Sequence, residues 1–182
     1  SDVYKRQDMK EVETVYGQTE QGLTIIEGNL FIKGQKPVEQ RSSYGLGEVI
    51  IDALNNGADN IVISLGGIDS FDGGIGMMQA LGAQFYNDEG ELLDAREGAQ
   101  VIKFIRRIDF SAIPQNFKDA HIQLMSDFSS KLYGKHSEIM KTYETHQLTR
   151  EKAAEIDNLI WYFSELVKNE MKIAMGPIER GG

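Results

Sequence analysis

Hydrophobic and polar positions follow two different periods along this chain, and the change of period predicts strands followed by helices. Short runs rich in β-branched residues predict three strands, over residues 23–27, 61–65 and 121–126. A helical spacing predicts helices over 45–54 and 77–81, each stopped by a following glycine, Gly57 and Gly82. Strands that alternate with helices indicate an α/β fold with a mostly parallel sheet and flanking helices.

The clearest single element is a long C-terminal helix that begins after Thr149, its predicted N-cap. Apolar residues then recur at helical spacing: Ile156, Leu159, Ile160, Phe163, Leu166 and Val167. This stripe predicts packing against a core, not a ligand site. Three further elements are expected: a hairpin that joins 83–86 to 91–93, a helix over 97–107 and a strand over 171–175.

Length, net charge and residue composition limit the classes of protein to which this chain can belong. The chain has 182 residues, enough for one domain or for a piece of a two-domain enzyme, and its net charge is -9. The acidic balance argues against nucleic-acid and membrane partners. The sequence has no cysteine, no apolar run of membrane-spanning length and no signal-peptide core. We therefore expect a cytoplasmic protein.

The first residues differ from the rest. Residues 1–7 have no initiator methionine and no apolar period, and we interpret them as a non-native leader or a natural disordered terminus. Residues 8–182 then form the α/β region, as one or two subdomains.

A glycine-rich loop follows the predicted strand at 61–65. It contains Gly66, Gly67, Gly73 and Gly74, and a helix follows it. Glycines let the backbone approach a phosphate or carboxylate, and the amides of the loop and helix supply positive potential. The alternative is an ordinary tight turn between a strand and a helix.

Two aspartates stand at the predicted carboxyl ends of strands, where α/β proteins bind ligands. Asp72 lies inside the glycine-rich loop, and Asp127 follows the strand at 121–126. Such carboxylates can hold Mg²⁺ or accept a proton from a substrate hydroxyl. The alternative for each is a cap on the following helix. Walker, G-x-G-x-x-G and G-x-S-x-G motifs are absent, and the three histidines lack metal-ligand spacing.

These motifs together resemble a known family. Residues 42–50 (SSYGLGEVI) and 63–67 (ISLGG), followed by Asp72-Gly73-Gly74, are similar to the signature region of bacterial glycerate kinases of the type I group. The resemblance is strongest over residues 16–134. It implies a two-domain glycerate-kinase-like fold and ATP-dependent phosphorylation of glycerate to a phosphoglycerate, with Mg²⁺.

The resemblance also implies roles for particular residues. Asp72 would be a catalytic base or a Mg²⁺ ligand, and Asp127 would contact a second metal or the substrate hydroxyl. Substrate and phosphate would be bound by Gly66, Gly67, Ser70, Gly73 and Gly74.

The chain departs from the family in its loops. The family loop reads Gly-Gly-x-Ala-Thr-Asn-Asp-Gly-Gly, whereas this chain places Phe71 where the asparagine stands and adds a carboxylate at Asp69. The change to Phe71 removes a hydrogen-bond donor and an acceptor, and Asp69 repels an anionic substrate. Two hypotheses follow: a working glycerate kinase, or a non-catalytic relative or fragment that retains ligand binding or self-association. A dehydrogenase is a distant third.

Overall fold

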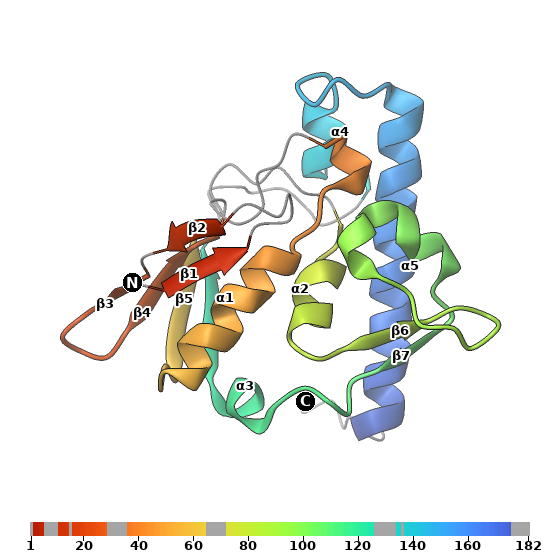
Figure 1. Ribbon diagram of the computed structural model, residues 1–182. Helices are drawn as coiled ribbons and strands as arrows, with labels where there is room; N and C mark the ends of the chain where they lie inside the picture. Colours follow the sequence, from red (N-terminus) through yellow and green to blue (C-terminus); the bar gives the residue numbers. More distant parts are fainter. Residues whose placement is uncertain are drawn as a thin grey trace, which may run out of the picture.

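The computed structural model in Figure 1 describes residues 2–5, 11–14, 16–28, 36–64, 72–125, 134–135 and 137–175. Its largest sheet has four strands in the order β3-β4-β5-β8. These are β3 (Gly17–Gln18), β4 (Thr24–Glu27), β5 (Asn60–Ser64) and β8 (His121–Met125). β4, β5 and β8 are parallel to one another, and β3 is antiparallel to β4. The mostly parallel α/β sheet and its three predicted strands are thus confirmed.

Helix α1 (Tyr44–Asn55) covers this sheet with the apolar face that its sequence pattern predicts. Ile26 and Ile63 are neighbours on β4 and β5, and both are buried beneath α1. α1 ends as predicted at Gly57, whose φ of 93° is the left-handed conformation that glycine tolerates best. The Ala58 N–H donates to the Ala53 carbonyl at 2.9 Å, which closes the helix end.

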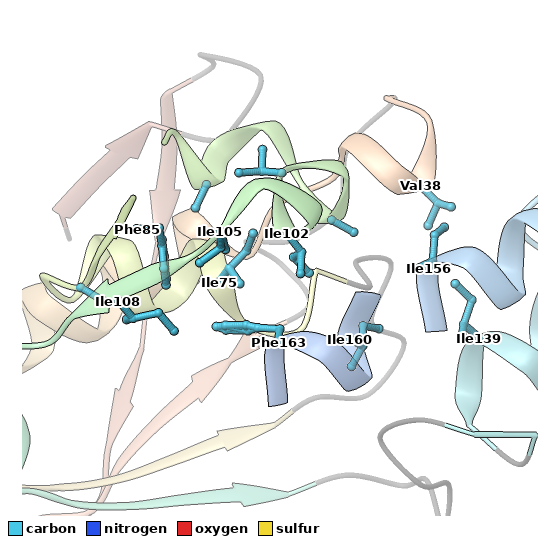
Figure 2. Packing of buried hydrophobic residues seen from close by; sticks show 14 of the residues in the cluster. Val38, Ile75, Phe85, Ile102, Ile105, Ile108, Ile139, Ile156, Ile160 and Phe163 are labelled. Atoms are coloured by element: carbon cyan, nitrogen blue, oxygen red, sulfur yellow. The ribbon is translucent and has the colours of Figure 1, made fainter. Parts of the chain in front are cut away.

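A second apolar core forms beside the sheet, around helix α5 (Arg150–Met175). Figure 2 shows Phe163 of α5 against Phe85 of β6 (Gln84–Tyr86), with ring centroids 5.8 Å apart in an edge-to-face arrangement. β6 pairs in antiparallel fashion with β7 (Arg107–Asp109). The core is completed by the 3-10 helices η2 (Val38–Gln40), η3 (Ala95–Glu97) and η4 (Ala99–Phe104) and by the α-helix α4 (Glu138–Thr142).

Helix α2 (Ile75–Ala80) connects the two cores, as its place between α1 and α5 in Figure 1 illustrates. Ile75 is buried in the α5 core, whereas Leu81, the C-cap of α2, is buried in the sheet core. α2 therefore packs against both the sheet core and the α5 core, with one end in each. The remaining short helix, α3 (Gln115–Asp119), precedes β8.

Two sequence-based expectations need correction, and a third is confirmed only in part. The predicted hairpin is present but short: Tyr86 and Leu92 form an antiparallel bridge and the Leu93 N–H donates to the Phe85 carbonyl at 2.8 Å, while the other edge of β6 pairs with the distant β7, which the sequence did not predict. The helix expected over 97–107 is η3 and η4, interrupted at Gly98 with φ 88° and followed by β7. The strand expected over 171–175 is the last part of α5, where methionine, lysine and alanine favour helix.

The N-terminal residues that the sequence analysis interprets as a leader include a strand. Residues 2–5 form β1 (Asp2–Lys5) and pair with β2 (Glu11–Thr14). Within the part of the chain that the structure describes, no helix is long and apolar enough to cross a membrane.

The close crossing of α1 and α2 depends on Gly47. A Cβ at this position would lie 2.5 Å from the Met77 carbonyl oxygen and 2.6 Å from the Ala80 Cβ. Neither neighbour is the far end of a flexible side chain, so the two helices must separate to admit a methyl group.

We therefore expect Gly47→Ala to destabilise the protein. Overpacking costs about 1–3 kcal/mol, and the better helix propensity of alanine offsets about 1 kcal/mol. Because the added Cβ would lie 2.5 Å from a backbone oxygen, the cost is at the upper end of this range, and the expected net loss is about 2 kcal/mol in urea unfolding monitored by circular dichroism. Gly17→Ala is the control, because no atom lies within 4 Å of its added Cβ. Equal stability of the two variants would contradict the close crossing.

Candidate functional site

The predicted site residues follow two adjacent strands. Ser64 of β5 and Met125 of β8 are paired in the parallel register, so the two strands end side by side at the same edge of the sheet. Asp72, Gly73 and Gly74 are described. Gly66, Gly67, Ser70 and Asp127 lie outside the described residues.

Asp72 is buried, with only 2% of its surface exposed, and its carboxylate accepts four hydrogen bonds. Oδ2 accepts from the Ser43 N–H at 2.8 Å, the Ser43 hydroxyl at 2.8 Å and the Gly76 N–H at 3.2 Å. Oδ1 accepts from the Gly74 N–H at 2.9 Å. Three of these donors reach Oδ2 and one reaches Oδ1, so most of the acceptor capacity of the carboxylate is used inside the protein.

Ser43 extends this network to the next amide of α2. While its hydroxyl donates to Asp72, the same oxygen accepts from the Met77 N–H at 2.9 Å. The Ile75 N–H donates to the Asp72 carbonyl at 3.3 Å. The backbone amides of residues 74–77 are thus all used inside the protein. We call Asp72, Ser43, Gly74, Gly76 and Met77 the Asp72 network.

The network explains a second glycine requirement. A Cβ on Gly76 would lie 2.6 Å from the Tyr44 nitrogen and still closer to the Ser42 hydroxyl oxygen. Only a glycine at this position lets the start of α2 approach the start of α1 closely enough for Ser43 to reach Asp72.

Burial raises the pKa of the Asp72 carboxyl, and the hydrogen bonds from Ser43, Gly74 and Gly76 offset part of that rise. The charged form needs these donors because no lysine or arginine forms a salt bridge with it among the described residues. An anion does lie at the N-terminus of α2, as the sequence pattern predicts, but it is the side chain of Asp72 itself.

This geometry does not fit Asp72 as a direct Mg²⁺ ligand. A metal ion requires lone pairs that here accept N–H and O–H groups, whose positive ends point at the carboxylate. Within the described ranges, no three His, Asp or Glu side chains form a metal-binding cluster. The contacts of Asp72 are those of the capping alternative considered from the sequence.

A cavity of about 210 Å³ lies beside the glycine-rich loop at Gly73. Its wall is mostly apolar, and it opens between α2 and α5. The lining residues are Gly73, Met78, Ile160, Phe163, Ser164, Val167 and Lys168. Gly73 has a φ of 67°, and a Cβ there would be 3.9 Å from Ile160, so α5 packs directly against the end of the loop.

One buried carboxylate was missed by sequence reasoning. Asp157 of α5 is 8% exposed and accepts hydrogen bonds from Gly134 and Ser137, the residues that follow the segment after β8. In the sequence it is one of several acidic residues along an amphipathic helix, next to Ile156 of the apolar stripe. Nothing in a single sequence distinguishes it from its exposed neighbours.

The fold is that of an α/β protein with a mostly parallel sheet, and the candidate residues follow the carboxyl ends of two of its strands, where such proteins bind ligands. The glycerate kinase family model matches residues 5–182. The chain belongs to the glycerate kinase family.

Individual relatives agree with this assignment. The chain is 28% identical over 141 residues to a glycerate kinase of Halalkalibacterium halodurans, covering 78% of this chain and 37% of that protein. It is 29% identical over 151 residues to glycerate 2-kinase of Escherichia coli, covering 80% of this chain and 39% of that protein. The chain thus spans well under half the length of these relatives.

A solved structure shares the fold. The structure, assigned as glycerate kinase 2 from Salmonella typhimurium, superposes with a TM-score of 0.82 at 24% identity. The match covers 92% of this chain and 46% of that chain.

The Asp72 network predicts a large stability loss for Asp72→Asn. The amide nitrogen cannot accept a hydrogen bond, so at least one buried donor is left unsatisfied and the charge-assisted bonds are lost. We expect a loss of about 2–4 kcal/mol in urea unfolding. Asp88→Asn, in an exposed turn, is the control and should change stability by less than about 0.5 kcal/mol. Wild-type stability of Asp72→Asn would show that the network is not formed.

Proposed function

We propose that this chain carries phosphotransferase chemistry of the glycerate kinase type: ATP-dependent phosphorylation of glycerate to a phosphoglycerate. Membership of the family over residues 5–182 supports the proposal. The observation that carries it is the glycine-rich motif after β5, whose described end, Asp72 to Gly74, belongs to the Asp72 network, together with the shared carboxyl edge at which β5 and β8 end. This is the edge at which parallel α/β sheets bind ligands.

Within this proposal, the glycine-rich segment forms the binding site for the anionic groups of substrate and nucleotide. Gly66, Gly67 and Ser70 supply backbone and hydroxyl donors, and Gly73 borders the adjoining cavity. Gly74 contributes its conformation, with φ of 84°, because its N–H already donates to Asp72.

The two aspartates then have different tasks. Asp72 holds the end of the glycine-rich segment against α1, which orients the segment without contact to the reacting atoms. Asp127 is the proposed catalytic carboxylate that contacts the glycerate hydroxyl or a metal ion. Mg²⁺ and ATP belong to the proposal because the family implies them, and Mg²⁺ would neutralise phosphate charge when bound.

The physiological setting follows from the same proposal. The substrate is a small organic acid of carbohydrate metabolism, the partner is neither a nucleic acid nor a membrane, and the expected location is the cytoplasm. The acidic net charge of -9 means that local amides and hydroxyls, not the overall field, must attract the anionic ligands.

A non-catalytic relative is the second candidate. One observation favours it: Phe71 replaces the asparagine of the family loop. Such a protein would retain ligand binding or self-association without phosphoryl transfer.

The decisive assay is ADP release that depends on D-glycerate, with ATP and Mg²⁺, after circular dichroism confirms that the chain is folded. Asp127→Asn should lower turnover by about 10²–10⁴-fold, the usual contribution of a positioned proton acceptor. Asp119→Asn, on the exposed end of α3, should leave turnover unchanged. Chelation of Mg²⁺ should abolish turnover, and added Mg²⁺ should restore it.

Two other results of this assay would point to a different function or to a different catalytic residue. A folded chain without turnover that still binds ATP or glycerate in calorimetry would favour the non-catalytic relative. Full activity of Asp127→Asn would refute the role proposed for Asp127.

A further inference from the structure

The cavity beside Gly73 lies against one face of α5. The residues that α5 contributes to it follow helical spacing and therefore share that face: Ile160, Phe163, Ser164, Val167 and Lys168. Gly73 and Met78 of α2 form the opposite wall. The apolar stripe of α5 thus packs the core at its start and lines a cavity further along the helix.

The inner wall of this cavity is fixed by core packing. Ile160 and Phe163 are 4% and 3% exposed, and Figure 2 shows them side by side on α5. The Phe163 ring is itself held edge-to-face by Phe85. The exposure of the lining residues rises toward Lys168, whose side chain is 56% exposed, so the cavity opens there. Its shape is therefore set before any ligand binds.

Two polar side chains interrupt the apolar lining. The Ser164 hydroxyl is half-buried at the cavity and makes no hydrogen bond to another residue in the described part of the chain. Lys168 Nζ lies 3.3 Å from the Glu165 carboxylate in an exposed pair. Exposed pairs of this kind contribute little free energy, so Lys168 can exchange Glu165 for an anion at small cost.

The chemistry of the lining distinguishes between the ligands of the proposed reaction. Glycerate and the phosphates of ATP carry charges that a mostly apolar wall would leave unpaired. The adenine base is uncharged and flat, with faces that pack on apolar and aromatic side chains and an edge that forms hydrogen bonds. At about 210 Å³ the cavity is also smaller than the ~300–1,000 Å³ of sites for whole drug-sized ligands. It therefore suits the base and not the whole nucleotide.

We propose that this cavity binds the adenine base of ATP. Ser164 contacts the edge of the base, and Lys168 stands at the opening, where the phosphates leave the cavity. This inference rests on the proposed function, which makes ATP a substrate. Gly73 belongs both to the cavity wall and to the glycine-rich motif, so the base lies next to the motif proposed to bind anions.

A cavity-filling variant, Val167→Phe, tests the proposal in the full chain. Isothermal calorimetry measures the binding of four ligands: ATP with Mg²⁺, adenosine, tripolyphosphate with Mg²⁺ and D-glycerate. Adenosine should compete with ATP for the wild-type chain. The added ring occupies the cavity, so Val167→Phe should weaken the binding of ATP and of adenosine at least tenfold. Tripolyphosphate and D-glycerate lack the base, and their affinities should stay within twofold.

Two further variants separate this effect from a general change in α5. Asn158→Phe adds the same ring at an exposed position earlier on the helix and should bind ATP within twofold of wild type. Ser164→Ala removes a single oxygen, so it tests the site even where Val167→Phe fails to fold. It should weaken ATP by about 2–10-fold, the contribution of one hydrogen bond, and leave tripolyphosphate unchanged.

The four ligands distinguish failure of this inference from failure of the proposed function. Val167→Phe that is folded by circular dichroism and binds ATP as tightly as wild type would overturn the base site and leave the proposed function intact. Weaker D-glycerate with unchanged adenosine would also overturn it, because the cavity would then belong to the acid. A wild-type chain that binds none of the four ligands would overturn both the function and the base site.

Discussion

The carboxylate of Asp72 is the interaction on which the arrangement of this protein depends. It occupies the N-terminus of α2 and accepts hydrogen bonds from Ser43, at the start of α1. α1 belongs to the sheet core, and α2 reaches into both cores. One buried carboxylate therefore joins the start of α1 to the start of α2, the helix that contributes to both cores.

This arrangement changes how the glycine-rich motif is interpreted, because the amides at its end are not open to a ligand. From the sequence, glycines before a short helix indicate amides that are open to a phosphate. In the structure, the amides of residues 74–77 already donate to Asp72 and Ser43. The glycines permit close approach of α1 and a left-handed turn, and any external anion must be bound by other donors. Asp157 of α5 likewise uses its carboxylate inside the protein, where it accepts hydrogen bonds from Gly134 and Ser137.

The sequence predicts the elements that carry a clear apolar pattern of their own, and it does not predict those that depend on one particular distant partner. α1 and its stop at Gly57 follow from spacing and one glycine, and the Thr149 hydroxyl does accept from the Lys152 N–H at 3.1 Å as an N-cap. β7 could not be predicted because it exists only through its pairing with β6. Asp157 was missed for the same reason, because its hydrogen-bond partners Gly134 and Ser137 lie 23 and 20 residues earlier in the chain.

The central claim is that Asp72 is the resident anion at the N-terminus of α2. NMR can detect the scalar coupling across hydrogen bonds between the Gly74 and Gly76 nitrogens and the Asp72 carboxyl carbon, before and after addition of ATP with Mg²⁺. The account predicts that both couplings are present and persist when ATP is added. Couplings that are absent, or that vanish as the nucleotide takes the place of the carboxylate, would contradict it.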